Sequence, residues 1–357
     1  MFQEMQVTTG GADPSNPTPG VQLNFVLRSG TNRWRASGRY YYENNELQAE
    51  NVPGSLVGEL QSYNRIEFYK DYGVEGGGPI LKDRLWGWGA YGKTNPALEI
   101  YNYRATDAAA LNTFRTDPGC KGVAQQHPAQ VRTYAITARD CTILENYSAK
   151  INGKLTEQAR GSFTYFRGNK QKFGRGASAT HPQPTTWNQA GPTDMFKGEV
   201  NYTLTNAIFL TGRYAYTGGG FSLEPIGGRN AQTVLDEHGI WQNSYVFYVT
   251  DRPQNNATFE GNYFRGAQEF KFGFGWRKTS VASESGWPGG VLTIYDGYPD
   301  MLSQVTRDAV IKANTVYWSG FLGDQISLNR WTFNLGLRWD RQIANLEETS
   351  VPASPLS

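Results

Sequence analysis

The chain has 357 residues and a formal net charge of +2 at pH 7, so it has room for one large domain or two to three ordinary ones. That balance gives no electrostatic reason to expect nucleic acid as a partner. Aromatic residues make up 14% of the chain and there are 41 Gly, whereas aliphatic residues are too sparse for a conventional core, so the composition favours either a soluble all-β protein or one whose apolar surface faces something other than itself.

Hydrophobic stretches are short throughout the chain. None comes near the roughly 18 to 20 apolar residues that a membrane-spanning helix requires, so a membrane role would have to use strands. The N-terminus, MFQEMQVTTGG, has neither the charged nor the apolar region of a signal peptide. If the protein is exported, we expect its true start to lie outside this chain.

The first structured stretch, 17–42, changes character partway along. Its beginning is rich in Pro and Gly and is followed by a short apolar run at 21–27. After a polar break, residues such as Trp34 alternate with Arg35 and Arg39. A period of two predicts a strand with two unlike faces, so this stretch joins something compact to something sheet-like.

The same alternation predicts about eleven strands of about ten residues each. They cover 33–43, 64–75, 85–93, 145–154, 160–170, 194–204, 207–217, 255–263, 267–278, 313–326 and 330–340. The final strand is the cleanest two-faced segment in the chain.

The connections between these strands are lopsided in length. Within each pair the turn is about two to six residues, whereas the links between pairs are much longer, at 44–63, 94–144, 171–193, 218–254 and 279–312. Short turns at one end and long loops at the other are typical of an up-and-down outer-membrane barrel. Ten residues at about 3.3 Å each, tilted by about 40°, also cover the roughly 25 Å apolar band of such a barrel.

We therefore predict an all-β, antiparallel, up-and-down transmembrane β-barrel with short periplasmic turns and long extracellular loops. Strands in lipid must close so that every backbone group is paired, and apolar side chains must point outward. The side chains expected to face lipid are Trp34, Phe270, Phe272, Phe274, Trp276, Trp331, Phe333, Leu335, Leu337 and Trp339. The alternative from another class is a soluble, secreted carbohydrate-binding or adhesive β-protein that uses exposed aromatic residues.

Two stretches resemble a known family. The run GVQLNFVLRSGTN at 20–32 resembles the end of the plug domain of TonB-dependent outer-membrane receptors, and GGPILKDRLW at 77–86 is similar to their first periplasmic turn. The chain looks like the Oar-like branch, whose members carry a carboxypeptidase-regulatory-like N-terminal domain. The segment NLGLRWD at 334–340 is similar to a recurrent strand ending in that superfamily.

The resemblance implies a 22-stranded barrel in the outer membrane, filled by a plug and energised through TonB. Residues 1–31 would be the C-terminal end of the plug, and 32–357 would be the N-terminal half of the barrel, with about 11 of the 22 strands. The plug–barrel junction would comprise Gly20, Asn24, Ser29, Gly30, Thr31 and Asn32. Expected partners are outer-membrane lipid, the TonB complex through a region absent from this chain, and an unidentified substrate bound by the extracellular loops.

Charged side chains of both signs fall on the predicted lumen faces. They are Glu67, Asp71, Glu260, Glu269, Arg35, Arg39, Lys150, Lys154, Arg213 and Lys271. Paired acids at a catalytic site are one interpretation. Opposite charges that line a wet interior and dock a plug are the other, and we favour it.

Cys120 and Cys141 lie in one predicted loop region, and an even count in an exported protein favours a disulfide over two free thiols or a metal pair. The three histidines, His127, His181 and His238, lack the spacing of a zinc site. The glycine pattern at 87–92 sits inside an aromatic strand, so we expect no nucleotide cofactor, and no motif suggests an enzyme.

Several aromatic residues fall in the predicted loops: Trp187, Trp241, Tyr245, Tyr248 and Trp287. They could stack on sugars or anchor a peptide, or they could pack beneath ordered loops, which is the interpretation we favour.

Overall fold

The computed structural model describes residues 2–9, 14–16, 21–49, 53, 55–56, 65–100, 138–178, 180–296, 301–305 and 309–350. Regular structure in these residues is β, apart from two single 3₁₀ turns, η1 (Gln183–Thr185) and η2 (Pro288–Gly290). No helix in this part of the chain is long and apolar enough to cross a membrane. The predicted all-β class is confirmed.

The strands form three sheets. In chain order they are β1 (Phe2–Thr8), β2 (Gln22–Leu27), β3 (Arg35–Asn44), β4 (Arg65–Leu81), β5 (Leu85–Ile100), β6 (Ala138–Lys154), β7 (Ala159–Arg175), β8 (Trp187–Thr205), β9 (Ile208–Pro225), β10 (Thr233–Leu235), β11 (Trp241–Gln242), β12 (Phe247–Asp251), β13 (Gln254–Arg265), β14 (Gln268–Gly286), β15 (Leu292–Asp296), β16 (Met301–Val305), β17 (Ala309–Leu328) and β18 (Trp331–Leu346).

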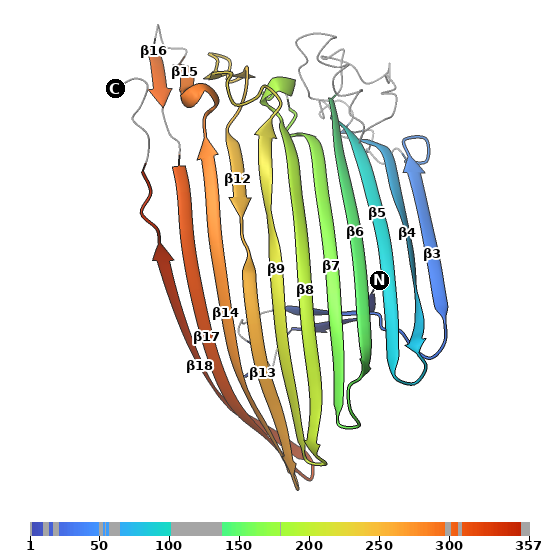
Figure 1. Ribbon diagram of the computed structural model, residues 1–357. Coiled ribbons are helices and arrows are strands. Elements are labelled where there is room, and N and C mark those ends of the chain that lie inside the picture. The colour runs from blue at the N-terminus through green and yellow to red at the C-terminus, as the bar shows by residue number, and fades with distance from the viewer. Residues whose placement is uncertain are drawn as a thin grey trace.

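The main sheet has twelve strands in the order β18-β17-β14-β12-β9-β8-β7-β6-β5-β4-β3, with β13 also between β9 and β14. Because β12 and β13 share one position, the sheet has eleven positions, which matches the eleven predicted strands. Every neighbouring pair in it is antiparallel, as predicted. The strands follow one another around a single curved wall, with β3 and β18 at its two margins (Figure 1).

The connections are sorted as predicted. The turns at 82–84, 155–158, 206–207, 266–267 and 329–330 all lie at one end of the sheet, and the strand ends that the longer connections join lie at the other (Figure 1). Asp83 and Asn329 take positive φ angles in two of these turns, a conformation that Asn and Asp tolerate better than most residues.

Most wall strands are longer than the sequence pattern predicted. β5 continues to Ile100 and β6 begins at Ala138, each several residues beyond the predicted limits, on the side of the long connections. A membrane demands apolar–polar alternation only within its own thickness. The same pattern is not required of strand residues beyond such a thickness, and the extensions of β5 and β6 do not carry it, which is why periodicity missed them.

The wall has no central hydrophobic core. The largest cluster of buried apolar residues in the described part of the chain joins Phe68, Ala97 and Cys141, with Phe173 against it. Large apolar side chains are exposed instead, with Trp34 at 74% and Leu337 at 77%. A soluble protein rarely leaves a whole face of such residues uncovered, so this face is shaped for an apolar surrounding.

β1 and β2 form a separate two-stranded hairpin, and its strands pair antiparallel from Phe2↔Leu27 to Thr8↔Gln22. One end contacts β4 to β6, and the turn residues Pro14 and Ser15 contact β18, on the opposite margin. A segment that touches both margins of a curved sheet must cross its concave side, as Figure 1 shows.

A small four-stranded sheet, in the order β11-β10-β15-β16, lies at the end of the long connections (Figure 1). Its strands come from two different connections, and β10 and β15 pair in parallel. We call this sheet with its flanking connections, residues 176–178, 180–186, 226–246, 287–296 and 301–305, the loop cap.

Candidate plug and lumen site

The hairpin is fixed to the near side of the wall by charged contacts. Arg28, just after β2, places its Nη1 atom 2.7 Å from Oε1 of Glu75 on β4. Its guanidinium also lies 5.9 Å from the centre of the Trp88 ring. Lys150 on β6 donates from Nζ to the carbonyl oxygen of Leu27 at 3.3 Å. The hairpin therefore contacts the concave face through polar and charged groups.

The segment between hairpin and wall is clamped onto the first short turn. Asn32 Oδ1 accepts hydrogen bonds from the Asp83 amide at 2.9 Å and from Trp86 Nε1 at 2.7 Å. The Asn32 amide group in turn donates to the Asp83 carboxylate. The buried Gly30 has no room for a side chain, because a Cβ atom there would lie 2.5 Å from the carbonyl oxygen of Gly87.

The other predicted junction residues have simpler surroundings. Asn24 lies within the hairpin and donates to Gln6 Oε1 at 3.4 Å. Ser29 is half-buried, and Thr31 donates from Oγ1 to the Arg33 carbonyl at 3.2 Å. Gly20 lies outside the described residues. The assignment of all six to a plug–barrel junction stays a prediction.

Replacing Asn32 with alanine should loosen this clamp. Two donors, the Asp83 amide and the Trp86 indole, would lose their acceptor, and because both bonds are exposed their loss should cost about 0.5 to 1.5 kcal/mol. Hydrogen exchange at the Asp83 amide should therefore speed by about two- to tenfold. Asn206→Ala, at the exposed turn between β8 and β9, is the matched control. Unchanged exchange at Asp83 would contradict the clamp.

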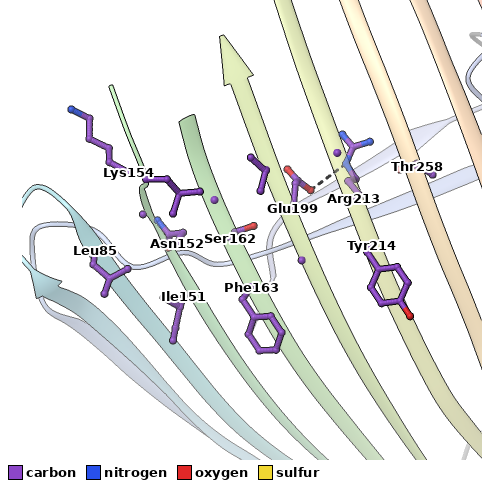
Figure 2. Close-up of a pocket in the computed structure, with 16 residues that line it drawn as sticks. Leu85, Ile151, Asn152, Lys154, Ser162, Phe163, Glu199, Arg213, Tyr214 and Thr258 are labelled. Atoms are coloured by element: carbon purple, nitrogen blue, oxygen red, sulfur yellow. Dashed lines mark hydrogen bonds and ion pairs between the residues drawn. The ribbon is translucent and has the colours of Figure 1, made fainter. Parts of the chain in front are cut away.

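The concave face carries pairs of opposite charges along its length. Arg213 on β9 joins two carboxylates, with Nε 3.2 Å from Glu199 Oε2 on β8 and Nη1 2.7 Å from Glu260 Oε2 on β13. Lys197 adds a second cation 3.0 Å from Glu199. Figure 2 shows Glu199 and Arg213 joined by a dashed line across neighbouring strands.

Several of the predicted lumen charges are brought together. Arg39 contacts Asp71 at 2.7 Å, and Lys271 lies 3.8 Å from Glu269. Lys154 instead pairs with Glu157 in a short turn at 3.4 Å, while Arg35 is exposed on β3 and Glu67 is half-buried on β4. Pairing of this kind neutralises charge along the lining.

Sequence reasoning missed Glu199, which bridges Lys197 and Arg213. The available signal was its position in the predicted strand 194–204, where it alternates with Val200 and shares a face with Lys197. Nothing in the sequence says which strand lies beside β8 or at what register, so its partner on β9 could not be named.

A hollow of about 810 Å³ separates the hairpin from the wall. On the hairpin side it is lined by Asn24 and Phe25, and on the wall side by polar groups that include Lys150, Glu199 and Arg213. A mixed polar lining of this size is suited to water and to a polar solute.

A second hollow, of about 680 Å³, runs along the same strands near the short turns. Figure 2 shows Phe163 and Tyr214 on one side of the sheet and Glu199 and Arg213 on the other. On the convex side its floor includes Gly198, where a Cβ atom would meet nothing within 4 Å. The wall is thus a single layer with an apolar and a polar face, as the alternation predicted.

Residue parity places the predicted lipid-facing side chains on the convex face, because Arg338 and Glu199 on alternate positions face the hairpin. Trp34 packs over Gly78, whose missing side chain leaves room for the indole. Phe274 and Trp276 contact Trp318 of the next strand, with ring centres 5.6 and 6.2 Å apart. Phe270 and Phe272 are half-buried against β13, and Trp331, Phe333, Leu335, Leu337 and Trp339 are exposed along β18. Contact with lipid stays a prediction for all ten.

The loop aromatics pack against one another. Tyr245 lies at the centre, with ring centres 5.0 Å from Trp187, 4.5 Å from Trp241 and 5.8 Å from Trp287. His181 stacks on Trp241 at 5.8 Å with an interplanar angle of 14°. This aromatic cluster holds three connections of the loop cap together, which agrees with packing beneath ordered loops. Tyr248 lies apart from it, on β12 against Phe221.

Burial in this cluster lowers the pKa of His181 below its usual 6.5. The folded cap therefore disfavours the imidazolium, whereas the opened cap accepts a proton near pH 6.5. The stability of the cap should be full above pH 6.5 and should fall as the pH drops through that value toward the lowered folded pKa. The protection factors of amides at 241–246, which correct for the slower intrinsic exchange at low pH, should fall at acidic pH, and His181→Phe should abolish this change. The control is His238→Phe, at an exposed histidine, which should keep the pH response. A pH response that is unchanged in His181→Phe would contradict the prediction.

The remaining predicted sites concern sulfur and metal. Cys141 lies on β6 with no exposed surface, and Cys120 lies outside the described residues, so their disulfide stays a prediction. Across the described ranges, no group of three or more His, Cys, Asp or Glu side chains could hold a metal ion.

Similar proteins are found among known sequences and among solved structures. No family model matches the chain. Over 201 residues it is 27% identical to the TonB-dependent transporter Oar of Myxococcus xanthus, a match that covers 51% of this chain and 17% of that protein. The chain thus spans well under two thirds of this relative.

Solved structures share the fold at low identity. The siderophore receptor PirA of Acinetobacter baumannii superposes with a TM-score of 0.61 at 13% identity, over 97% of this chain and 44% of PirA. The outer-membrane transporter YddB of Escherichia coli gives 0.58 at 9% identity, over 92% and 42%. The chain has the fold of slightly less than half of each of these two proteins.

Proposed function

We propose that this chain forms the end of the plug and the first half of the barrel wall of a TonB-dependent outer-membrane transporter. Residues 1–31 belong to the plug, and 32–357 belong to the wall. The observation that carries the proposal is the hairpin, which crosses the concave face of an eleven-position sheet and continues directly into its first strand.

The sorted connections orient the wall in the membrane. The short turns face the periplasm, and the loop cap faces the cell exterior, where it meets the substrate. The wall contacts lipid through its convex aromatic face, and energy reaches the hairpin from the TonB complex through other parts of the protein. PirA is a siderophore receptor, and we place recognition of this protein's own substrate on the same, external side.

The chain acts in transport and not as an enzyme. Its relatives are transporters and receptors, and its lumen charges pair with one another across strands. A soluble carbohydrate-binding protein is not favoured, because it would bury the row from Leu335 to Trp339 that is exposed on β18. A passive porin is disfavoured because it would have no plug-like segment before its first strand.

Cell fractionation tests the proposal directly. The protein should enter the outer-membrane fraction, require detergent for extraction, and migrate faster on gels unheated than after boiling, because a folded barrel resists the detergent. Recovery as a soluble monomer without detergent would overturn it.

A further inference from the structure

The far end of the hairpin is held by a built site on β18, 323 and 324 residues away in the sequence. Arg338 donates from Nη1 to the carbonyl oxygens of Pro14 at 2.9 Å and Ser15 at 3.1 Å. A single guanidinium nitrogen thus bridges two successive backbone carbonyls in the turn of the hairpin.

The remaining nitrogens of this guanidinium are fixed by the wall itself. Nε lies 3.0 and 2.9 Å from the two oxygens of Asp340, and Nη2 lies 3.1 Å from Tyr317 Oη on β17. Tyr317 also donates to Asp340, which closes the triangle. These contacts come from the wall alone, so Asp340 and Tyr317 orient the guanidinium of Arg338 independently of the hairpin.

The surface beside Arg338 is shaped to accept the same turn. Gly336 on β18 pairs with Gly323 on β17, and both lie against Pro14. A Cβ atom on Gly336 would lie 2.1 Å from Cγ of Pro14, so the proline ring occupies the space that a side chain would fill. The hydrogen bonds from Arg338 and the space that Gly336 leaves for the Pro14 ring together indicate specific recognition of this turn.

We propose that Arg338, oriented by Asp340 and Tyr317, is a positioning residue that latches the hairpin across the lumen. The opposite end of the hairpin continues covalently into β3 and is pinned by Arg28 and Glu75. When Arg338 releases the turn, the far end of the hairpin is therefore free, whereas its connection to β3 stays fixed. The hairpin then rotates about this connection and uncovers the concave face. The proposal rests on the transport function proposed above, because it supplies the motion that a solute needs.

The test is hydrogen–deuterium exchange of the full-length protein in detergent, followed by mass spectrometry. Arg338→Ala should speed exchange in 14–16 and 22–27 by about tenfold or more, because it removes charge-assisted hydrogen bonds. Exchange in β8 and β9 should not change. Arg338→Lys should fail to restore protection, because an ammonium cannot reproduce the fork. Arg341→Ala, on the same strand but the convex face, should match the unsubstituted protein.

A second variant separates latching from folding of the sheet. Gly336→Ala keeps Arg338, Asp340 and Tyr317 but pushes Pro14 from its seat, so it should expose the same hairpin amides. In cells, both variants should admit a hydrophilic dye that the unsubstituted protein excludes, without loss of the fast-migrating folded band.

The outcomes are distinct. If neither Arg338→Ala nor Gly336→Ala exchanges faster in the hairpin than Arg341→Ala, the latch is overturned. In that case a retained fast-migrating band would leave the membrane barrel standing. If the unsubstituted protein itself has no such band, the proposed function fails, irrespective of the latch.

Discussion

Replacing Leu335 with arginine is expected to lower the stability of the membrane-inserted protein by about 2 to 4 kcal/mol, the cost of a charge on the lipid face of a barrel near the bilayer midplane. Leu335 lies four residues into β18 and is 62% exposed on the convex face. Four to five residues at about 3.3 Å each and a tilt of about 40° place it about 10 to 13 Å above the turn, near the middle of the apolar band.

The adjacent Asn334 provides the control, because it lies on the same strand but on the concave, polar face. Asn334→Arg should change stability little. Urea unfolding in lipid vesicles, followed by the loss of the fast-migrating band, measures both variants on one scale. Equal midpoints for Leu335→Arg and Asn334→Arg would contradict a membrane position for β18.

The second large effect is expected from Arg213→Ala. This change leaves Glu199 on β8 and Glu260 on β13 on the same concave face, on either side of β9, without the cation that joins them. Hydrogen bonds to charged groups contribute about 1.5 to 3 kcal/mol, and we expect the lower half of that range because the side chains of Arg213 and Glu260 are 33% and 36% exposed.

The loss of stability should be partly reversed when one of the two carboxylates is neutralised. Arg213→Ala combined with Glu260→Gln should be more stable than Arg213→Ala alone, because a repulsive pair is removed. Arg160→Ala, at the exposed turn end of β7, should have little effect. If Arg213→Ala unfolds at the same urea concentration as Arg160→Ala, the lumen pairs do not hold the strands together.

Periodicity was sufficient to predict the wall. The alternation in β14 and β18 fixed which side chains share a face, because a strand has only two faces and a membrane requires them to differ. The plug–barrel junction was predicted from a family resemblance and not from periodicity; Asn32 accepts a hydrogen bond from the first short turn, and its place at a junction stays a prediction.

Contacts between distant parts of the chain could not be predicted in the same way. The aromatic cluster around Tyr245 joins three connections that have no shared pattern, and the contact of Arg338 with Pro14 joins opposite ends of the chain. Each depends on the curvature and register of the whole sheet. Local pattern carries no information about either.

The eleven positions of the wall have one further consequence, which concerns strand polarity. Eleven is odd and neighbouring strands alternate in direction, so β3 and β18 point the same way, as their arrows do in Figure 1. If β3 and β18 paired directly, the two strands would be parallel. Joining like margins of two copies related by an axis along the membrane normal would also pair parallel strands. A closed barrel with only antiparallel pairs therefore requires an odd number of additional strands between β18 and β3. At each margin, a strand that runs in the opposite direction is a more suitable pairing partner than a second copy of this wall.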